Sequence, residues 1–264
     1  MRSLLYVPAH AERFLARAGE RGADAVILDL EDSVPDAEKD AARDGLAHWV
    51  PKVGPKVFVR INAGARQLDD ALAAAAAGAH GLVVPKVQDP RALEALSGSL
   101  RGAGHFSLPF IALLEDAAAV LDARAIARLP QVAALALGSE DLATAMGAEA
   151  SPDVLRFPKL MVHYAAKAEG KLSLGLLQSI ADYADLDALK AAAAEARAHG
   201  FDGATCVHPS GVLVLNAAFA PGSEELDWAR RVVEAATGQA CAFALDGRMI
   251  DAPILARARK LLGM

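Results

Sequence analysis

The chain has 264 residues, of which 54% are hydrophobic and 23% are charged, so it can bury the core of one large domain. Its formal net charge is −6, and its Lys and Arg residues are scattered, which argues against a nucleic-acid partner. The cysteines, Cys206 and Cys241, are too few for a disulfide scaffold, and no stretch reaches the roughly 20 apolar residues of a membrane span. These properties predict a cytoplasmic protein that does not bind a membrane.

Short runs rich in Val, Ile and Leu alternate along the chain with longer alanine-rich stretches that carry Arg, Glu and Lys. This alternation is typical of β/α units and a parallel sheet. Because eight such runs fit the roughly 250 residues of a (β/α)8 barrel, they favour this TIM barrel over an open sheet. The predicted strands are residues 3–9, 24–31, 56–62, 81–87, 108–115, 132–138, 171–178 and 203–209.

Three alanine-rich segments between the strands, residues 69–78, 116–129 and 186–200, are predicted to be helices. Gly78 and Gly200 stand where two of these helices should end before the next strand.

The chain changes character after Pro221. Residues 223–238 and 254–263 have the pattern of helices, and residues 240–253 between them form a segment that we expect to be irregular. We therefore expect a barrel domain over residues 1–221 and a helical segment outside it over residues 222–264.

Charged and polar residues follow most of the predicted strands at the point where each strand ends. In a (β/α)8 barrel the carboxyl ends of the strands meet at one rim, and the active site lies there. We expect this rim to receive Asp29, Glu31, Asp32, Arg60, Asn62, Lys86, Glu115, Asp141 and His208.

Carboxylates gathered in one pocket repel one another unless a cation lies among them. Mg²⁺ takes oxygen ligands, often from only one or two carboxylates, and keeps positions for substrate oxygens. Glu115 and Asp141 follow adjacent predicted strands, so we predict that they hold Mg²⁺. The alternative is that they cap helices, a role that Asp116 and Ser139 could also fill.

Arg60 follows three apolar residues and is placed to bind a substrate carboxylate in bidentate fashion. The alternative is an ion pair of Arg60 with Glu31 or Asp32. Strand alternation predicts that Asp29 and Glu31 point to one face and Asp32 to the other. Lys86 has two open roles: it could anchor an acid of this cluster or bind a ligand phosphate. We assign Arg60 and Asp32 to catalysis, and Arg60, Glu31 and Lys86 to substrate binding.

Several blocks occur in an order that resembles the citrate lyase beta-subunit-like family, which includes malyl-CoA and citramalyl-CoA lyases. The blocks are LLYVPA, GADAVILDLEDSV, VRIN, VVPKV, LLED, LGSEDLA, GFDGATCVHPSGV, NAAFAP and GRMIDAP, and they span nearly the whole chain. Their order makes the resemblance more specific than any single block.

The resemblance implies a (β/α)8 barrel, commonly trimeric, that binds Mg²⁺ and cleaves or forms a carbon–carbon bond beside a thioester or keto acid. Glu115 and Asp141 resemble the family's metal ligands, and Arg60 resembles the arginine that holds the substrate carboxylate. The GRMIDAP block resembles a C-terminal lid whose aspartate, here Asp251, reaches the active site of a neighbouring subunit and takes part in catalysis. These matches imply a homo-oligomer that acts on a small molecule.

The implied reaction is cleavage or formation of a hydroxyacyl-CoA thioester, such as malyl-, citramalyl- or citryl-CoA, through an enolate. Two alternatives stay open: a malate synthase-like or acyl-CoA thioesterase activity of the same superfamily, and a non-catalytic subunit of a larger lyase complex. The chain departs from the family at Leu177 and Gln178, where many relatives carry an acid, and at Phe157 and Pro158, where many have Ala-Arg. The departures bear on the acyl group that fits.

Overall fold

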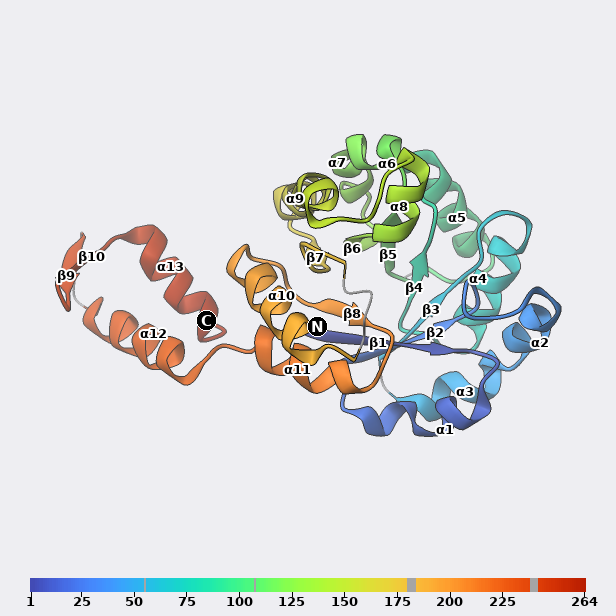
Figure 1. Ribbon diagram of the computed structural model, residues 1–264, viewed down its shortest axis with the longest axis horizontal. Helices are drawn as coiled ribbons and strands as arrows, with labels where there is room; N and C mark the ends of the chain where they lie inside the picture. Colours follow the sequence, from blue (N-terminus) through green and yellow to red (C-terminus); the bar gives the residue numbers. More distant parts are fainter. Residues whose placement is uncertain (55, 107, 180–183, 238–241) are drawn as a thin grey trace. The chain divides into compact units, whose positions relative to one another are not determined.

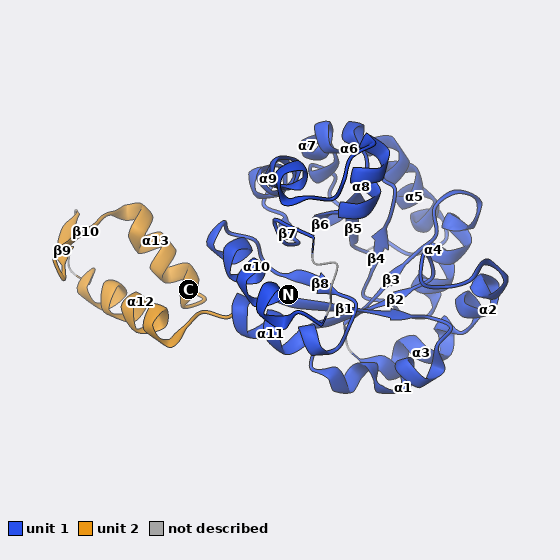
Figure 2. Cartoon of the chain, in the orientation of Figure 1, with its two compact units in different colours: residues 1–219 blue, residues 220–264 orange. Residues whose placement is uncertain are grey.

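The computed structural model describes residues 1–264 except 55, 107, 180–183 and 238–241. The chain divides into two compact units, Met1–Phe219 and Ala220–Met264 (Figure 2). The first unit contains an eight-stranded sheet whose neighbouring strands are all parallel. Its strands are β1 (Ser3–Pro8), β2 (Ala25–Asp29), β3 (Val57–Arg60), β4 (Gly81–Val84), β5 (Phe110–Leu114), β6 (Val132–Leu137), β7 (Leu172–Leu174) and β8 (Ala204–Cys206).

The sheet closes on itself. Strands β1 to β7 lie in sequence order, β8 pairs with the other side of β1, and an isolated parallel bridge joins Leu174 of β7 to Gly203 just before β8. The predicted (β/α)8 barrel is therefore confirmed, and each of its strands lies within a predicted range.

Helices follow the strands and surround the sheet in the first unit (Figure 1). They are α1 (Glu12–Ala18), α2 (Lys39–Asp44), α3 (Leu46–Val53), α4 (Gln67–Ala76), α5 (Pro90–Gly102), α6 (Ala117–Leu121), α7 (Ala123–Ala127), α8 (Ser139–Met146), α9 (Pro152–Ala168), α10 (Leu186–Ala198) and α11 (Ser210–Phe219). Among the described residues, every helix is too short or too polar to span a bilayer.

The predicted helix over residues 116–129 is interrupted: α6 ends at Leu121 and α7 begins at Ala123, because the Asp122 backbone (φ −90°, ψ 5°) leaves the helical region. Helices α4 and α10 end as predicted, since Gly78 and Gly200 take the left-handed conformation (φ 80° and 93°) that a side chain disfavours.

Side chains of the strands alternate between the two faces of the barrel wall. One buried cluster fills the interior and includes Leu4, Ile27, Phe58 and Leu113. A larger cluster lies between the strands and the helices, and it takes the residues in between, such as Leu5 and Leu28 in β1 and β2. The two clusters fix which strand positions face inward.

The second unit contains α12 (Ser223–Ala235), β9 (Phe243–Leu245), β10 (Arg248–Ile250) and α13 (Ala252–Leu261). The prediction of an irregular segment over residues 240–253 was wrong for its described part, because β9 and β10 form an antiparallel hairpin. Asp246 and Gly247 make the two-residue turn with positive φ angles of 51° and 74°, the combination that a type I′ hairpin turn requires. Cys241 lies outside the described residues.

Candidate active site

A cavity of about 540 Å³ lies at the carboxyl ends of the barrel strands. Every second residue of a strand faces the barrel interior, and the next inward position beyond the buried core lies in the cavity. Asp29 lies two residues after Ile27, Arg60 two after Phe58, and Glu115 two after Leu113. Five of the residues predicted for the rim line this cavity, namely Asp29, Asp32, Arg60, Glu115 and Asp141. A cation and four carboxylates thus meet at one opening, and strand parity accounts for Asp29, Arg60 and Glu115.

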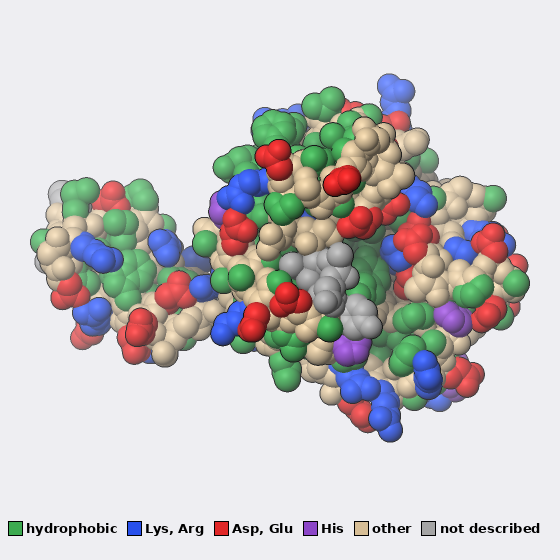
Figure 3. Space-filling view, viewed as in Figure 1, with side chains coloured by type: hydrophobic (Ala, Val, Ile, Leu, Met, Phe, Trp, Pro, Cys, Tyr) green, Lys and Arg blue, Asp and Glu red, His purple; other side chains and the backbone are tan. Residues whose placement is uncertain are grey.

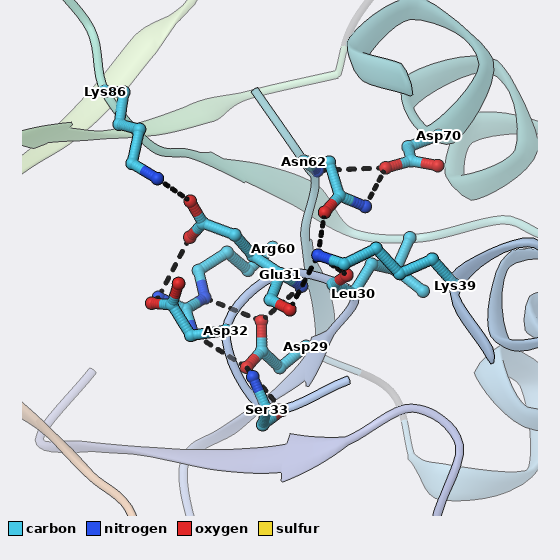
Figure 4. Close-up of polar contacts among 10 residues, drawn as sticks. All are labelled: Asp29, Leu30, Glu31, Asp32, Ser33, Lys39, Arg60, Asn62, Asp70 and Lys86. Atoms are coloured by element: carbon cyan, nitrogen blue, oxygen red, sulfur yellow. Dashed lines mark hydrogen bonds and ion pairs between the residues drawn. The ribbon is translucent and has the colours of Figure 1, made fainter. Parts of the chain in front are cut away.

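Arg60 is held mainly by Asp29, its register partner on the neighbouring strand β2. The Arg60 Nε donates to Asp29 Oδ1 at 2.6 Å and its Nη2 donates to Asp29 Oδ2 at 2.7 Å, so the pair is bidentate (Figure 4). Nη1 contacts Glu31 Oε2 at 3.1 Å and donates to Asp32 Oδ2 at 2.9 Å. The ring of Tyr6 lies 5.0 Å below the guanidinium carbon. The ion pairs with Glu31 and Asp32 named as the alternative role of Arg60 are present, together with the stronger pair to Asp29.

The predicted separation of Asp32 from Asp29 and Glu31 was wrong, since all three reach Arg60. Strand β2 ends at Asp29, and the following backbone turns around its carboxylate, which accepts hydrogen bonds from the Glu31 and Ser33 amides at 2.9 and 3.2 Å. Alternation holds only while the chain stays in the strand, so it does not apply to Asp32.

Burial and charge set the protonation of this cluster. Burial by itself raises the pKa of Asp29, but hydrogen bonds and charge from Arg60 outweigh it and leave that pKa below its ordinary value. Burial raises the pKa of Glu31, although Arg60 and Lys86 oppose it. For Arg60, the opposing effect of burial is outweighed by Asp29, so its pKa rises. The guanidinium stays charged, and the Asp29 carboxylate is its permanent counter-ion.

Lys86 connects the Arg60 cluster to Glu115. Its Nζ lies 3.1 Å from Glu31 Oε1, and its backbone amide donates to Glu115 Oε2 at 2.7 Å. Lys86 takes a left-handed backbone (φ 50°), which costs a non-glycine residue roughly 1–2 kcal/mol. In this backbone conformation the Lys86 amide donates to the Glu115 carboxylate. Of the two roles left open for Lys86, the structure shows the contact with an acid of the cluster.

Glu115 is buried and lies against Gly138 at the end of β6. A Cβ at Gly138 would approach Glu115 Cγ to 2.6 Å and Oε1 to 2.7 Å, so the Glu115 side chain occupies the space that only a glycine leaves. Burial raises the pKa of Glu115 to about 7, with further increases from the charges of Asp141 and Glu31. The two carboxylates of Glu115 and Asp141 thus act on one another within the same cavity.

The capping alternative for Glu115 and Asp141 was wrong. The Asp116 carboxylate caps α6 by accepting the Ala119 amide at 2.7 Å, which leaves Glu115 out of the cap. The residue before α8 is Gly138, and α8 has no side-chain cap in the described part of the chain. Ser139 therefore does not cap α8 either.

A donor set of two carboxylates fits Mg²⁺ better than a softer metal. Glu115 and Asp141 offer oxygen atoms only, which is the ligand type that Mg²⁺ prefers. The described residues contain no group of three or more His, Cys, Asp and Glu side chains that could hold a metal ion, as a zinc site requires. Burial is the main cause of the raised pKa of Glu115, and a divalent cation would offset both this effect and the added repulsion from Asp141.

A second layer of contacts supports the cluster. Lys39 Nζ donates to the backbone carbonyls of Leu30 and Glu31 at 3.3 and 2.9 Å and also to Asn62 Oδ1 (Figure 4). The Asn62 amide groups donate in turn to Asp70 Oδ2 at 2.9 and 2.7 Å. Asn62 therefore holds the loop after β2 rather than lining the cavity.

Asp251, which the resemblance places in the active site of a neighbouring subunit, and His208, which was predicted for the rim, both have local partners. Asp251 belongs to the second unit, where its carboxylate caps α13 by accepting the Ile254 amide at 3.1 Å. His208 Nδ1 lies 2.7 Å from Ser210 Oγ at the beginning of α11.

On the face shown in Figure 3, acidic and basic side chains are interspersed.

Sequence reasoning missed Gly138, Tyr6 and the buried Lys159 of α9. The inward direction of Tyr6 could have been predicted from strand alternation, because it lies two residues after the inward-facing Leu4. Lys159 was also readable, since it lies four residues after Leu155 and three before Val162, on the apolar face of its helix. The role of Gly138 depends on a contact with another strand, which no local pattern reports.

Comparison with known sequences identifies relatives over most of the chain. The sequence model of the HpcH/HpaI aldolase/citrate lyase family matches residues 2–209. A citrate lyase subunit beta-like protein of Mycobacterium tuberculosis is 35% identical over 267 residues, which cover 98% of this chain and 93% of the relative. A (3S)-malyl-CoA thioesterase of Cereibacter sphaeroides is 31% identical over 274 residues, covering 99% and 93%.

Solved structures share the fold. The protein CitE of Mycobacterium tuberculosis in complex with magnesium, acetoacetate and coenzyme A has a TM-score of 0.84 and 32% identity, covering 100% of this chain and 98% of that one. The citrate lyase beta subunit of the same organism complexed with oxaloacetate and magnesium has a TM-score of 0.71 and 31% identity, covering 83% and 97%.

Proposed function

Because the chain belongs to the HpcH/HpaI aldolase/citrate lyase family, we propose that it is a magnesium-dependent carbon–carbon lyase. Its proposed substrates are hydroxyacyl-CoA thioesters such as malyl-, citramalyl- or citryl-CoA, which it cleaves or forms through an enolate. One observation carries the proposal: Glu115, Asp141 and Arg60 line one cavity at the carboxyl ends of the barrel strands. A related protein has been crystallised with magnesium, acetoacetate and coenzyme A.

In this proposal Glu115 and Asp141 would hold Mg²⁺, which when bound would supply electrostatic stabilisation of negative charge that develops on substrate oxygen. Arg60 binds the substrate carboxylate through Nη1, which exchanges its contacts with Glu31 and Asp32 for the substrate while Nε and Nη2 keep their bonds to Asp29. Asp29 thereby fixes the plane of the guanidinium before the substrate arrives, which lowers the ordering cost of binding. Glu31 and Lys86 hold the other side of this subsite.

Proton transfer is assigned to two aspartates. Asp32 contacts Arg60 and keeps 60% of its side-chain surface exposed, so it is free to face a substrate hydroxyl and accept its proton in the cleavage direction. Asp251, carried by a C-terminal lid of a neighbouring subunit, would return a proton to the enolate. This second assignment requires a homo-oligomer, which we propose to be a trimer.

The test is an assay of malyl-, citramalyl- and citryl-CoA with Mg²⁺, in which keto acid and free CoA are measured separately. We expect keto acid release by the wild type and a loss of at least 100-fold in Glu115→Gln and Asp141→Asn. Glu94→Gln is the matched control, since Glu94 is an exposed acid on α5. Full activity of Glu115→Gln on the compound that turns over would contradict the proposal.

A second candidate is thioester hydrolysis, because the relative from Cereibacter sphaeroides is a (3S)-malyl-CoA thioesterase and aligns with 99% of this chain. The same assay separates the two reactions. Hydrolysis releases free CoA and a hydroxy acid without a keto acid, whereas cleavage of the carbon–carbon bond releases a keto acid and leaves the thioester intact.

A further inference from the structure

A side pocket of about 180 Å³ adjoins the main cavity on the side of β6, β7 and β8. The two cavities share wall residues, among them Leu137, Ser139, Gly175 and Thr205. Strand β7 lies four strands from β3 in either direction around the barrel, so the side pocket is across the mouth from Arg60. A molecule that reached from Arg60 across the cavity would enter this pocket with its far end.

Lys159 lines the side pocket and is only 6% exposed. It lies on the buried face of α9 with Leu155, Val162 and Ala166. In the described part of the chain, its ammonium has no hydrogen bond and no ion pair. Burial lowers the pKa of Lys159 to about 8, and the charge of Glu140 opposes this only in part. A cation in these surroundings is costly without a partner, so an anion that entered the pocket would stabilise the charged form of Lys159.

The rest of the pocket wall suits an anion. Ser139, Gln178 and Thr205 provide hydroxyl and amide groups that donate hydrogen bonds. The segment after β7, residues 175–179, reads Gly-Leu-Leu-Gln-Ser and contains no carboxylate. The nearby acid Glu140 accepts the Ser179 hydroxyl at 2.8 Å, so it has a partner other than Lys159. The volume of about 180 Å³ is large enough for a carboxylate on a short chain.

We propose that the side pocket binds a second carboxylate of the substrate through Lys159, and that Lys159 thereby favours citryl-CoA, whose keto-acid part carries two carboxylates, over malyl- and citramalyl-CoA, whose keto-acid parts carry one. The inference rests on the proposed function, because the first carboxylate is the one that Arg60 binds. Lys159 is a specificity-determining residue in this assignment, and the reacting atoms lie at the other side of the cavity.

The test compares two hydroxy acids that differ in the second carboxylate, malate and lactate, by calorimetric titration in the presence of Mg²⁺. We expect the wild type to bind malate about 10- to 100-fold more tightly than lactate, the range for a hydrogen bond to a charged group. Lys159→Met should lose this preference and bind lactate as the wild type does. Lys190→Met is the control, because Lys190 is exposed on α10.

Two further measurements keep the inference separate from folding and from a phosphate site. Lys159→Met should melt no lower than the wild type without ligand, because it removes a cation that has no described partner; a lower melting temperature would show a structural role and overturn the inference. Coenzyme A, which carries phosphates, should bind equally to both proteins. A loss of coenzyme A affinity with unchanged malate affinity would overturn the carboxylate assignment.

The malate and lactate titrations need no turnover, so they remain informative if the lyase assay fails. Absence of keto acid from every thioester would refute the proposed function alone. Equal affinities of the wild type for malate and lactate, or equal malate affinities of the wild type and Lys159→Met, would refute the anion pocket alone.

Discussion

Gly138→Ala is the sharpest test of how the Glu115 carboxylate is positioned. The added Cβ would lie 2.6 Å from Glu115 Cγ and 2.7 Å from Oε1, whereas carbon atoms in contact are about 3.5–4.0 Å apart. The Gly138 backbone cannot retreat freely, because its amide donates to the Leu114 carbonyl at 3.0 Å across the β5–β6 pair. The Glu115 side chain must therefore turn away and give up the 2.7 Å hydrogen bond from the Lys86 amide.

The expected cost of Gly138→Ala is about 1–3 kcal/mol of unfolding free energy, the range for overpacking a filled site. At about 2–4 °C per kcal/mol for a chain of this size, the melting temperature should fall by about 2–12 °C. Calorimetric titration with Mg²⁺ should show an affinity about 10- to 100-fold lower, because the carboxylate has lost its orientation.

Gly98→Ala is the matched control for Gly138→Ala. Gly98 lies within α5, and a Cβ there meets nothing within 4 Å, so this change should stabilise the protein by about 1 kcal/mol through helix propensity. If Gly138→Ala retained the wild-type melting temperature and Mg²⁺ affinity, the contact between Gly138 and Glu115 would not position the carboxylate.

Three further changes separate the roles of neighbouring residues. Burial raises the pKa of Glu115 above its unfolded value to about 7, so its contribution to stability is complete below about pH 4.5 and is lost as the pH rises through 7. Glu115→Gln should remove this pH-dependent component from melting curves. The affinity of the wild type for Mg²⁺ should rise with pH up to about 7, because the metal binds the deprotonated carboxylate. Asp116→Ala should lower the unfolding free energy by about 0.5–2 kcal/mol in urea titrations through loss of the α6 cap, with Mg²⁺ affinity unchanged; a large loss of affinity would move the metal site to Asp116. Lys39→Met should lower the unfolding free energy by about 1–3 kcal/mol, because two loop carbonyls and Asn62 lose a charged donor. An unchanged unfolding free energy in urea titrations would show that other contacts hold the loop after β2.

The barrel was predictable because its signal is local and repeated. Each strand is a short apolar run, and the alternation with alanine-rich helices is read directly from the chain. The rim followed from the same pattern, since the carboxyl ends of parallel strands meet at one edge. The hairpin turn of the second unit was also readable, because Asp-Gly between two short runs is a strong local signal.

The contacts of the site were predictable only where the regular strand continued. Asp29 and Arg60 occupy paired positions on adjacent strands, so their ion pair follows from register. Asp32 lies beyond the end of β2, where the turn around the Asp29 carboxylate, and not strand alternation, sets its direction. The break in the helix at Asp122 has no Gly or Pro to signal it, and the space for Glu115 beside Gly138 is created by two segments that meet only in the fold.

The closure between β7 and β8 divides the wall of the barrel into a stiff and a soft part. Strands β1 and β2 share five register pairs, as do β5 and β6, whereas an isolated bridge joins Leu174 to Gly203 in the described chain. Glu115 and Asp141 thus lie just beyond the well-paired strands β5 and β6, whereas the pocket beside Lys159 lies at the closure between β7 and β8. Substitutions that enlarge the cavity for a bulkier substrate should therefore cost the least stability between β7 and β8. The backbone amides there should exchange hydrogen before those of β1, β2, β5 and β6.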